Sequence, residues 1–215
     1  MIKELTAEIK NVKPALQQTH CYVQPGCQLY NEDCLETVKR LGKIDLILTD
    51  PPYPDYLADE YKYFDGIIEF MKQFDCRQLI FWSAKAEFPL NYTAIHIWDK
   101  ARGVGTMYER IFERNGGNGY KVYRGQKYNN ELDAIINRDT LTDHPSQKPI
   151  KLISKLLDQY SKEGDTIFDP FAGSGTTAIA CLKYKRNFIG SELNQDHYNK
   201  TVKRLKAHLS KPELF

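Results

Sequence analysis

The sequence predicts an α/β domain built on a mostly parallel, twisted sheet. Short apolar runs bounded by turn residues alternate along the chain with segments whose apolar residues recur at helical spacing. The run IDLIL at residues 44–48 is nearly all apolar, as expected of a strand that is covered on both faces. A glycine-rich loop joins a later strand pattern to the next helix pattern, which is typical of parallel α/β folds. We therefore expect helices on both faces of the sheet and an antiparallel strand at its edge.

The expected strands share short apolar or alternating patterns between turn residues. They are residues 27–30, 44–48, 78–82, 92–98, 107–112, 166–169 and 187–191.

The helices are expected from their start signals and their apolar faces. Asp33 followed by Glu36 indicates a helix N-cap with its reciprocal partner, and Gly42 is expected to end that helix. Helical spacing predicts further helices at 65–74, at 150–160 with Pro149 in the first turn, and at 176–186. In a last amphipathic helix the residues expected to point inward are Tyr198, Val202, Leu205 and Leu209.

The chain of 215 residues fits one ordinary domain. Residues 1–26 show no strong period and contain two prolines, which predicts an N-terminal arm before a domain at 27–215. Within that domain, the stretch at about 115–139 is polar, basic and irregular. We expect it to form an insertion at the domain edge.

Composition argues against several classes of protein. No apolar run approaches the ~18 residues of a membrane span, and the first residues lack the apolar core of a signal peptide, so we expect no membrane partner and a cytoplasmic location. Five cysteines form an odd count without a CxxC pair, which argues against a disulfide framework and a zinc ribbon. A metal site at His20, Cys21, Cys27 and Cys34 is open in principle, but we expect none.

The stretch FDPFAGSGTT at 168–177 is predicted to bind a nucleoside-bearing cofactor. Its glycines would let the backbone approach a ligand, and Glu192 at the end of the next strand could accept hydrogen bonds from ribose hydroxyls. The dinucleotide fingerprint GxGxxG is incomplete because Ala178 stands at its third glycine. Asp169 would repel a pyrophosphate but could receive a cationic amino group, which favours S-adenosylmethionine over NAD. The alternative is a tight turn without a ligand.

The tetrapeptide Asp50-Pro51-Pro52-Tyr53 follows the run at 44–48 and indicates a site for a planar amine. The prolines would hold the Asp50 side chain and offer carbonyl acceptors without amide donors, while Tyr53 adds a ring for stacking. Acceptors beside a ring suit the exocyclic amino group of a nucleobase, because they can localise a lone pair that is otherwise delocalised. A rigid loop, or a polyproline ligand for a partner, is the alternative.

Together, TDPPY, FDPFAGSGTT and HPSQKP resemble the catalytic, cofactor-loop and cofactor-flanking motifs of DNA amino-methyltransferases, which act on adenine N6 or cytosine N4. Their order resembles that of the class called β, and the likeness spans about residues 27–207. The resemblance implies a Rossmann-like AdoMet-dependent methyltransferase fold, with S-adenosyl-L-methionine as cofactor. It also implies direct in-line methyl transfer to a base rotated out of the duplex, without a cysteine nucleophile.

The resemblance assigns roles to single positions. Asp50, Pro51, Pro52 and Tyr53 would form the target-base site. The cofactor-binding positions that it implies are Asp169, Pro170, Phe171, Gly173, Ser174, Gly175, Thr176 and Glu192, with His144, Ser146 and Lys148 in a segment that closes over the cofactor. Asp33 matches an acidic position near the cofactor's adenine, although a helix cap explains this residue equally well.

A basic stretch from Lys100 to Tyr128 is the candidate DNA surface. It carries seven basic residues against two acidic ones, with four tyrosines among them. The basic residues that could meet phosphates or guanine edges are Lys100, Arg102, Arg110, Arg114, Lys121, Arg124 and Lys127. A solvated edge hairpin is the alternative. Only about 25 residues, 115–139, remain for recognition, so we expect a short target sequence or contacts from a second subunit.

We therefore expect a site-specific methyltransferase that acts on double-stranded DNA. Within the family, DPPY tends to accompany adenine and SPPY cytosine, so Asp50 favours adenine N6, with cytosine N4 as the alternative. An RNA or protein methyltransferase, or an inactive AdoMet- or DNA-binding subunit, fits the motif order and the intact Asp50 and Tyr53 less well. The sequence leaves open the recognition site, a homodimer and a cognate restriction enzyme.

Overall fold

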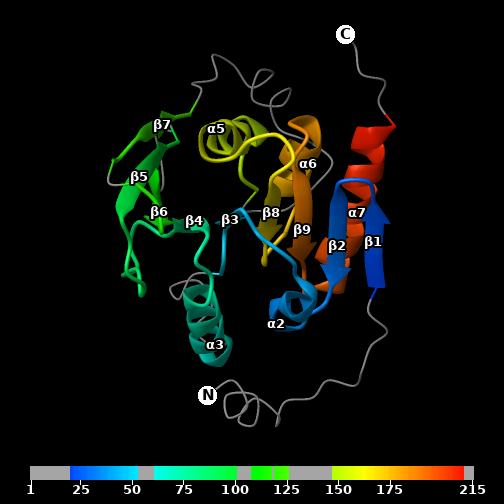
Figure 1. Ribbon diagram of the computed structural model, residues 1–215, viewed down its shortest axis with the longest axis horizontal. Coiled ribbons are helices and arrows are strands. Elements are labelled where there is room, and N and C mark those ends of the chain that lie inside the picture. Colours follow the sequence, from blue (N-terminus) through cyan, green and yellow to red (C-terminus); the bar gives the residue numbers. More distant parts are fainter. Residues whose placement is uncertain (1–19, 53–60, 101–107, 118, 126–146, 211–215) are drawn as a thin grey trace.

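The computed structural model is built around one mixed sheet with helices on both faces (Figure 1). It describes residues 20–52, 61–100, 108–117, 119–125 and 147–210. In these ranges the sheet has nine strands in the order β1-β2-β9-β8-β3-β4-β6-β5-β7. Their bounds are β1 (His20–Gln24), β2 (Cys27–Asn31), β3 (Leu46–Thr49), β4 (Arg77–Trp82), β5 (Ala94–Asp99), β6 (Tyr108–Arg114), β7 (Val122–Arg124), β8 (Thr166–Asp169) and β9 (Asn187–Ser191).

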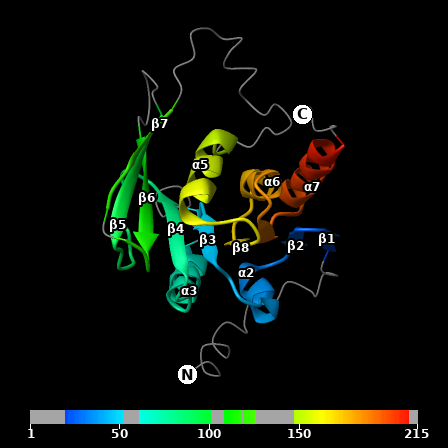
Figure 2. The same cartoon turned by 45° about the horizontal axis from the view of Figure 1, so that its top comes forward.

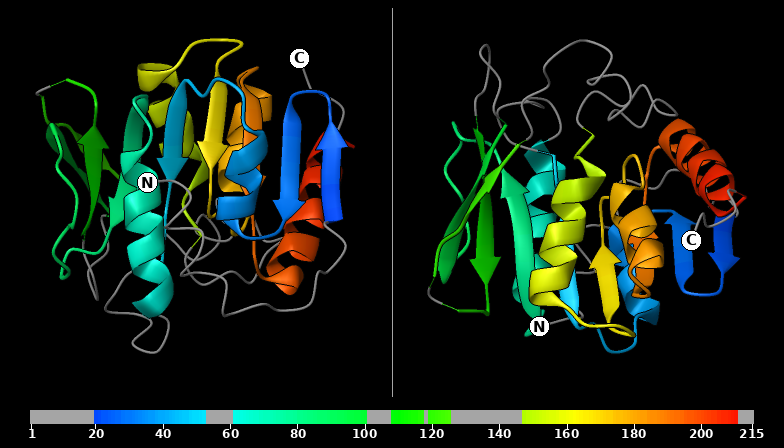
Figure 3. Two further views of the ribbon diagram at one scale, coloured as in Figure 1. Left: turned by 60° about the horizontal axis from the view of Figure 1, so that its bottom comes forward. Right: turned by 90° about the horizontal axis from the view of Figure 1, so that it is seen from above.

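The helices form two layers, one on each side of the sheet (Figure 2). The left view of Figure 3 faces one layer and the right view faces the other. The first layer comprises α2 (Cys34–Thr37), which continues as the 3₁₀ helix η2 (Val38–Arg40), and α3 (Tyr61–Lys72). The second comprises α5 (Ile150–Tyr160), α6 (Thr176–Lys183) and α7 (Gln195–Leu209).

Each layer buries its own apolar cluster against the sheet. Leu46 and Leu48 of β3 belong to the cluster under α5, α6 and α7, whereas Ile47 of the same strand belongs to the cluster that includes Phe70 of α3. Successive side chains of a strand point to opposite faces, so a strand covered on both faces must be apolar at nearly every position. All four residues of β3 are buried, which confirms the expectation for a doubly covered strand.

The two central parallel strands, β3 and β8, mark the point where the chain reverses its direction of winding. β3 pairs with β8, and Ile47 lies opposite Phe168. From this pair the chain passes through α3 to β4 on one side, and through α6 to β9 on the other. A crevice forms outside the carboxyl ends of parallel strands at such a point, and ligands of open α/β sheets bind there. The fold therefore places the DPPY segment and the glycine loop at one edge of the sheet.

The expected α/β architecture is confirmed, but several local expectations differ from the structure. Residues 20–24, assigned to an N-terminal arm, form β1 antiparallel to β2. Part of the expected insertion at 115–139 forms β7, which pairs parallel to β5. The sheet thus carries antiparallel pairs towards both edges. Within the described ranges, the structure contains no helix long and apolar enough to span a membrane.

Two side-chain expectations are also wrong. The side chain of Glu36 pairs with Lys39 and is not the reciprocal partner of the helix cap. Leu209 is 47% exposed, whereas Arg204, which directly precedes the buried Leu205 in α7, is 1% exposed. Arg204 takes this inward position because it bonds to the glycine loop.

Candidate active site

The carboxyl end of β3 carries the first half of the candidate site. Asp50 follows the last residue of β3, and its side chain is 25% exposed. Pro51 is buried and Pro52 is exposed. A proline fixes its own backbone φ and donates no amide hydrogen, so this turn is stiff and rich in acceptors, as expected. Tyr53 lies outside the described residues.

The second half of the site begins with Asp169, the last residue of β8. The hydroxyl of Thr49 donates a hydrogen bond of 2.8 Å to Oδ1 of Asp169, and the Phe171 amide donates one of 3.1 Å to the same oxygen. The two strand ends are therefore joined by a direct contact. The sequence analysis missed Thr49, although its place directly before Asp50 was a signal that could have found it.

Asp169 is a buried carboxylate that has no cation beside it in the described part of the chain. It is 3% exposed, and the described ion pairs do not include it. Burial raises its pKa to about 6, against hydrogen bonds from Thr49, Thr177 and Phe171 that lower it, and the nearby charge of Asp50 adds to the rise. A buried acid that is only partly compensated favours a cationic ligand group, because that group would supply the missing charge.

The glycine loop owes its shape to contacts with α7. Gly175 has φ +73°, in the left-handed region that favours glycine, and a Cβ there would lie 2.5 Å from the Thr201 methyl carbon. The Thr201 hydroxyl donates to the Gly173 carbonyl at 2.5 Å. Arg204 donates to the carbonyl of Ser174 at 2.5 Å and to the hydroxyl of Thr176 at 3.1 Å. Thr201 and Arg204, which the sequence analysis did not select, hold the loop from behind.

Glu192 closes the other side of the same loop. Its carboxylate accepts hydrogen bonds of 2.9 Å from the amides of Gly173 and Asn194, and His197 Nδ1 lies 3.9 Å away. Burial raises the pKa of Glu192, although both amide bonds lower it. Each oxygen that accepts an amide retains a second lone pair, so the carboxylate can also accept hydrogen bonds from a ligand hydroxyl.

Lys148 lies beside Asp50, which the sequence analysis did not expect of a residue assigned to the cofactor side. Its ammonium pairs with Oδ2 of Asp50 and lies 3.1 Å from Oε2 of Glu109 on β6. Its side chain is only 8% exposed. Burial lowers the pKa of Lys148, but the two carboxylates raise it by more, so the net pKa is above its ordinary value and Lys148 is charged. No sequence signal marked Glu109, because its partner is distant in the chain.

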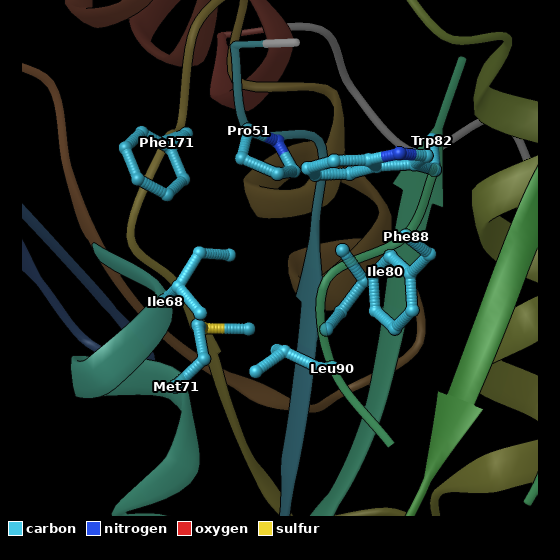
Figure 4. Close-up of a pocket in the computed structure, with 8 residues that line it drawn as sticks. All are labelled: Pro51, Ile68, Met71, Ile80, Trp82, Phe88, Leu90 and Phe171. Atoms are coloured by element: carbon cyan, nitrogen blue, oxygen red, sulfur yellow. The ribbon is translucent and has the colours of Figure 1, made fainter. Parts of the chain in front are cut away.

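A small apolar cavity lies beneath the two halves of the site (Figure 4). It is lined by Pro51, Ile68, Met71, Ile80, Trp82, Phe88, Leu90 and Phe171. A space this small and apolar suits neither a water, which needs polar partners, nor a base. Its apolar walls instead support Pro51 and Phe171, the residues that bring the two loops together above it.

Comparison with known proteins places this geometry in a family. The family described as DNA methylase, comprising N6 and N4 methyltransferases, matches residues 75–203. The chain belongs to the N6/N4 DNA methylase family. The matched segment contains the glycine loop and Lys148, and it begins after Asp50.

Curated members of this family are similar to short parts of the chain. The type II methyltransferase M.HindIII of Haemophilus influenzae is 42% identical over 78 residues, 36% of this chain and 25% of the relative. M2.DpnII of Streptococcus pneumoniae is 42% identical over 64 residues, which are 30% of this chain and 24% of the relative. The DNA adenine methyltransferase YhdJ of Escherichia coli is 38% identical over 78 residues, which are 35% of this chain and 26% of the relative. The matches thus span about a quarter of the length of these relatives.

Solved structures share the fold over most of this chain. The complex of M1.HpyAVI with SAM has a TM-score of 0.60 at 22% identity, and covers 83% of this chain and 98% of that one. The cytosine-N4-specific PvuII DNA methyltransferase has a TM-score of 0.64 at 14% identity, and covers 90% and 89%. At these identities the likeness shows the fold, which confirms the Rossmann-like methyltransferase fold expected from the sequence.

Two of the DNA-binding candidates make structural contacts. Arg114 is 9% exposed and donates to the carbonyls of Asn91 and Met71. Arg110 donates to the carbonyls of Ser83 and Ala86. Arg114 is buried with its donors on the protein itself, so assigning it to DNA was wrong. Arg110 is only half-buried, and a contact between it and DNA stays a prediction.

The remaining DNA-binding candidates differ in exposure. Lys100 pairs with Glu109 at 2.5 Å and its side chain is 15% exposed. Lys121, directly before β7, and Arg124, its last residue, are exposed, and Lys121 also contacts Gln159 at 3.3 Å. Arg102 and Lys127 lie outside the described residues, as do His144 and Ser146 of the HPSQKP segment.

Asp33 acts as the cap of α2. Its side chain accepts a hydrogen bond of 2.8 Å from the Leu35 amide. This bond confirms the structural role that the sequence analysis left open, and the role near a cofactor stays a prediction.

Proposed function

We propose that this protein transfers a methyl group from S-adenosyl-L-methionine to the N6 amino group of adenine in double-stranded DNA. The observation that carries the proposal is the joining of Thr49 and Asp169, which brings the DPPY carboxylate and the buried cofactor-loop carboxylate to one edge of the sheet. Family membership and similarity to an enzyme named as a DNA adenine methyltransferase support the choice of substrate.

The residues at the glycine loop fit S-adenosyl-L-methionine. Asp169 is buried and only partly compensated, so it suits the cationic amino group of the methionine part. The carboxylate of Glu192 suits the ribose hydroxyls, and the left-handed Gly175, which packs closely against Thr201, sets the turn of the loop. Pro170, Phe171, Ser174 and Thr176 complete the loop. The bound cofactor would supply a methyl group on a cationic sulfur.

The chemistry at the target amine depends on Asp50. The exocyclic nitrogen of adenine is a poor nucleophile because its lone pair is delocalised into the ring. Asp50 and the carbonyl of Pro51 would accept its two hydrogens and direct the lone pair towards the donor, and Asp50 would take up the proton released after transfer. Alignment is the main contribution of the protein, because positive charge on the sulfur is lost during transfer and needs no added stabilisation.

The target base must leave the duplex before it can reach Asp50, at a cost of a few kcal/mol. Tyr53 would stack on the extruded base. Lys121, Arg124 and the segment at 115–139 form the proposed DNA surface, where cations would meet phosphates. The short length of this segment favours a short recognition sequence or help from a second copy. We also propose that the protein works together with a restriction enzyme and that it is located in the cytoplasm.

Methylation of cytosine N4 is the second candidate. The similarity to the fold of a cytosine-N4-specific enzyme favours it. Asp50 and the name of YhdJ favour adenine.

Transfer of labelled methyl groups tests the proposal. The protein is incubated with methyl-labelled AdoMet and, in parallel, with plasmid DNA, tRNA and protein. We expect label in adenine of DNA alone. Label only in tRNA or protein, or label in none of the three, would contradict the proposed function.

A further inference from the structure

We propose that Lys148 is a positioning residue that aims the Asp50 carboxylate at the target amine, and that Glu109 and Lys100 hold the Lys148 ammonium in place through an alternating chain of charges. The inference rests on the proposed function, because it concerns how the same site works. It assigns to the lysine of HPSQKP a role at the target base in place of one at the cofactor.

The position of Lys148 leaves its ammonium little freedom. It lies two residues before α5, whose N-cap is Pro149, and its side chain is 8% exposed. The ammonium sits 5.2 Å from the centre of the Phe81 ring, between Asp50 and Glu109. A buried lysine held by two carboxylates and a ring cannot sample many rotamers. Lys148 therefore fixes the direction of the Asp50 carboxylate.

The contacts extend beyond Lys148 in alternating sign. Glu109 pairs through its other oxygen with Lys100 at 2.5 Å. Lys100 lies 5.1 Å from the Trp98 ring centre, and the rings of Trp98 and Phe81 meet edge to face at 6.5 Å. The two lysines thus lie over two neighbouring aromatic rings, and their charges balance those of Asp50 and Glu109. Lys100 is also the first residue of the basic stretch proposed for DNA.

The charges around Asp50 explain why it needs Lys148. Asp169 at the end of β8 is close enough for the Asp50 charge to raise its pKa, and Glu109 lies on the far side of Lys148. Without the ammonium, three carboxylates would share a partly buried region, and the least costly response is for one of them to bind a proton. Protonation of Asp50 would turn an acceptor for the amine into a donor.

The test compares the pH dependence of methyl transfer in wild-type protein and in Lys148→Met, which keeps the length of the side chain without its charge. We expect the single-turnover rate at neutral pH to fall about 100-fold, and the acid limb of the profile to move upward by about one pH unit or more. The Kd of AdoMet should change by less than about threefold. In Lys148→Arg, the acid limb of the pH profile should lie at the same pH as in the wild-type protein. Lys155→Met, on the exposed side of α5, is the matched control.

A second variant predicts a shift of opposite sign. Glu109→Gln removes the competing carboxylate and leaves Lys148 to Asp50 alone, so the acid limb should move downward. If Lys148→Met does not fold, Lys148→Met combined with Glu109→Gln removes a buried charge of each sign and provides the folded sample. A purely structural role would lower the rates without moving the limb, and that result would overturn the inference.

A readout without activity separates this inference from the proposed function. The ¹³C resonance of the Asp50 carboxyl, assigned with Asp50→Asn, is titrated in both proteins. A higher titration midpoint in Lys148→Met supports the inference even if the wild-type protein methylates no DNA, in which case only the proposed function fails. An unchanged midpoint, or a loss of AdoMet affinity as large as the loss of rate, overturns it.

Discussion

The hydroxyl of Thr49 donates a 2.8 Å hydrogen bond to Oδ1 of Asp169, and so ties the end of β3 to the end of β8. One strand leads into the DPPY turn and the other into the glycine loop. The bond therefore fixes the spacing between the carboxylate proposed for the target amine and the carboxylate proposed for the cofactor.

Thr49→Val should weaken AdoMet binding while it preserves the fold. The change keeps the shape of a side chain that is 2% exposed but removes a hydrogen bond to a buried carboxylate, which costs about 1–3 kcal/mol. We expect the Kd of AdoMet to rise about tenfold, measured by calorimetry, since the ligand needs Asp169 ionised and oriented. Thr93→Val, which removes a hydroxyl bonded to the Glu113 carbonyl, is the control. Equal affinities in both variants would contradict the role of Thr49.

AdoMet affinity should depend on pH through Asp169. Burial raises the pKa of Asp169 to about 6, so the carboxylate is ionised above this pH and protonated below it. Because a cationic amino group needs the ionised form, we expect the Kd to be constant above pH 7 and to rise by up to about tenfold per pH unit below 6. Calorimetric titrations between pH 5 and 8 measure this. A Kd that stays constant throughout would exclude Asp169 as the ionic partner.

In the ligand-free protein, the ionisation of Asp169 should have the opposite effect, because it lowers the stability of the fold as the pH rises. The raised pKa of Asp169 means that its contribution to stability is fully present below its ordinary pKa of 3.8 and is lost as the pH rises through about 6. The difference in stability between wild-type protein and Asp169→Asn, measured without AdoMet, isolates this contribution from other titrating groups.

Gly175→Ala should destabilise the protein by more than the strain of placing alanine in a left-handed backbone conformation. Both Gly175 (φ +73°) and Gly164 (φ +85°) are left-handed, but only a Cβ at Gly175 meets another group, the methyl carbon of Thr201. We expect Gly164→Ala to cost about 1 kcal/mol, and Gly175→Ala about 2–4 kcal/mol, with loss of AdoMet binding. Urea unfolding and calorimetry measure the two effects.

A rescue variant tests the cause. Thr201→Ser removes the methyl group that the new Cβ would meet and keeps the hydroxyl that bonds to the Gly173 carbonyl. Combined with Gly175→Ala, it should restore the stability of the protein to about that of Gly164→Ala. No recovery would show that the loop depends on something other than this contact.

A buried network between β5 and β6 should make stability depend on pH. The Lys121 amide donates to Nδ1 of His96, so Nε2 carries the hydrogen that meets Glu113 at 2.9 Å, and the ring is neutral. Burial lowers the pKa of His96 below its ordinary 6.5, although Glu113 raises it. Below pH 6.5, His96 binds a proton in the unfolded chain but not in the folded protein. The contribution of His96 to stability is therefore fully present above pH 6.5 and is lost as the pH falls towards the pKa of His96 in the folded protein.

Urea unfolding at pH 7.5 and 5.5 checks this expectation. The wild-type protein should lose more stability between these values than His96→Gln, by no more than about 1.4 kcal/mol per pH unit for one proton. His197→Gln, whose side chain is 40% exposed, is the control. An identical pH dependence in wild type and His96→Gln would mean that His96 titrates normally.

The central fold could be predicted because its signals are local. The run IDLIL is apolar since both faces of β3 are covered, and the glycine-containing loop at 170–175 follows β8 directly. The edge strands β1 and β7 gave no such signal. HCYVQ and VYR are short and mixed in polarity, and pairing with β2 and β5 makes them strands. Backbone pairing at a sheet edge does not require an apolar pattern.

The motifs of the site were also local, but the contacts between them were not. Thr49 and Asp169 are 120 positions apart, and Asp50 and Lys148 are 98 apart. No sequence period links such pairs. Arg114 shows the complementary error, because positive charge predicts a DNA contact only if the side chain is exposed. Its guanidinium is buried instead and satisfied by carbonyls of Met71 and Asn91.

The central claim is that the protein methylates adenine and needs Asp50 to do so. Modified bases in the DNA of the expression host test this claim most directly. Sequencing for modified bases is applied to hosts that express the wild-type protein, Asp50→Ala, or the control Asp158→Ala on the exposed face of α5. We predict N6-methyladenine at one short site with the wild type and the control, and none with Asp50→Ala, whose AdoMet affinity stays within about threefold of wild type. Modified adenine with Asp50→Ala, or N4-methylcytosine alone with the wild type, would contradict the claim.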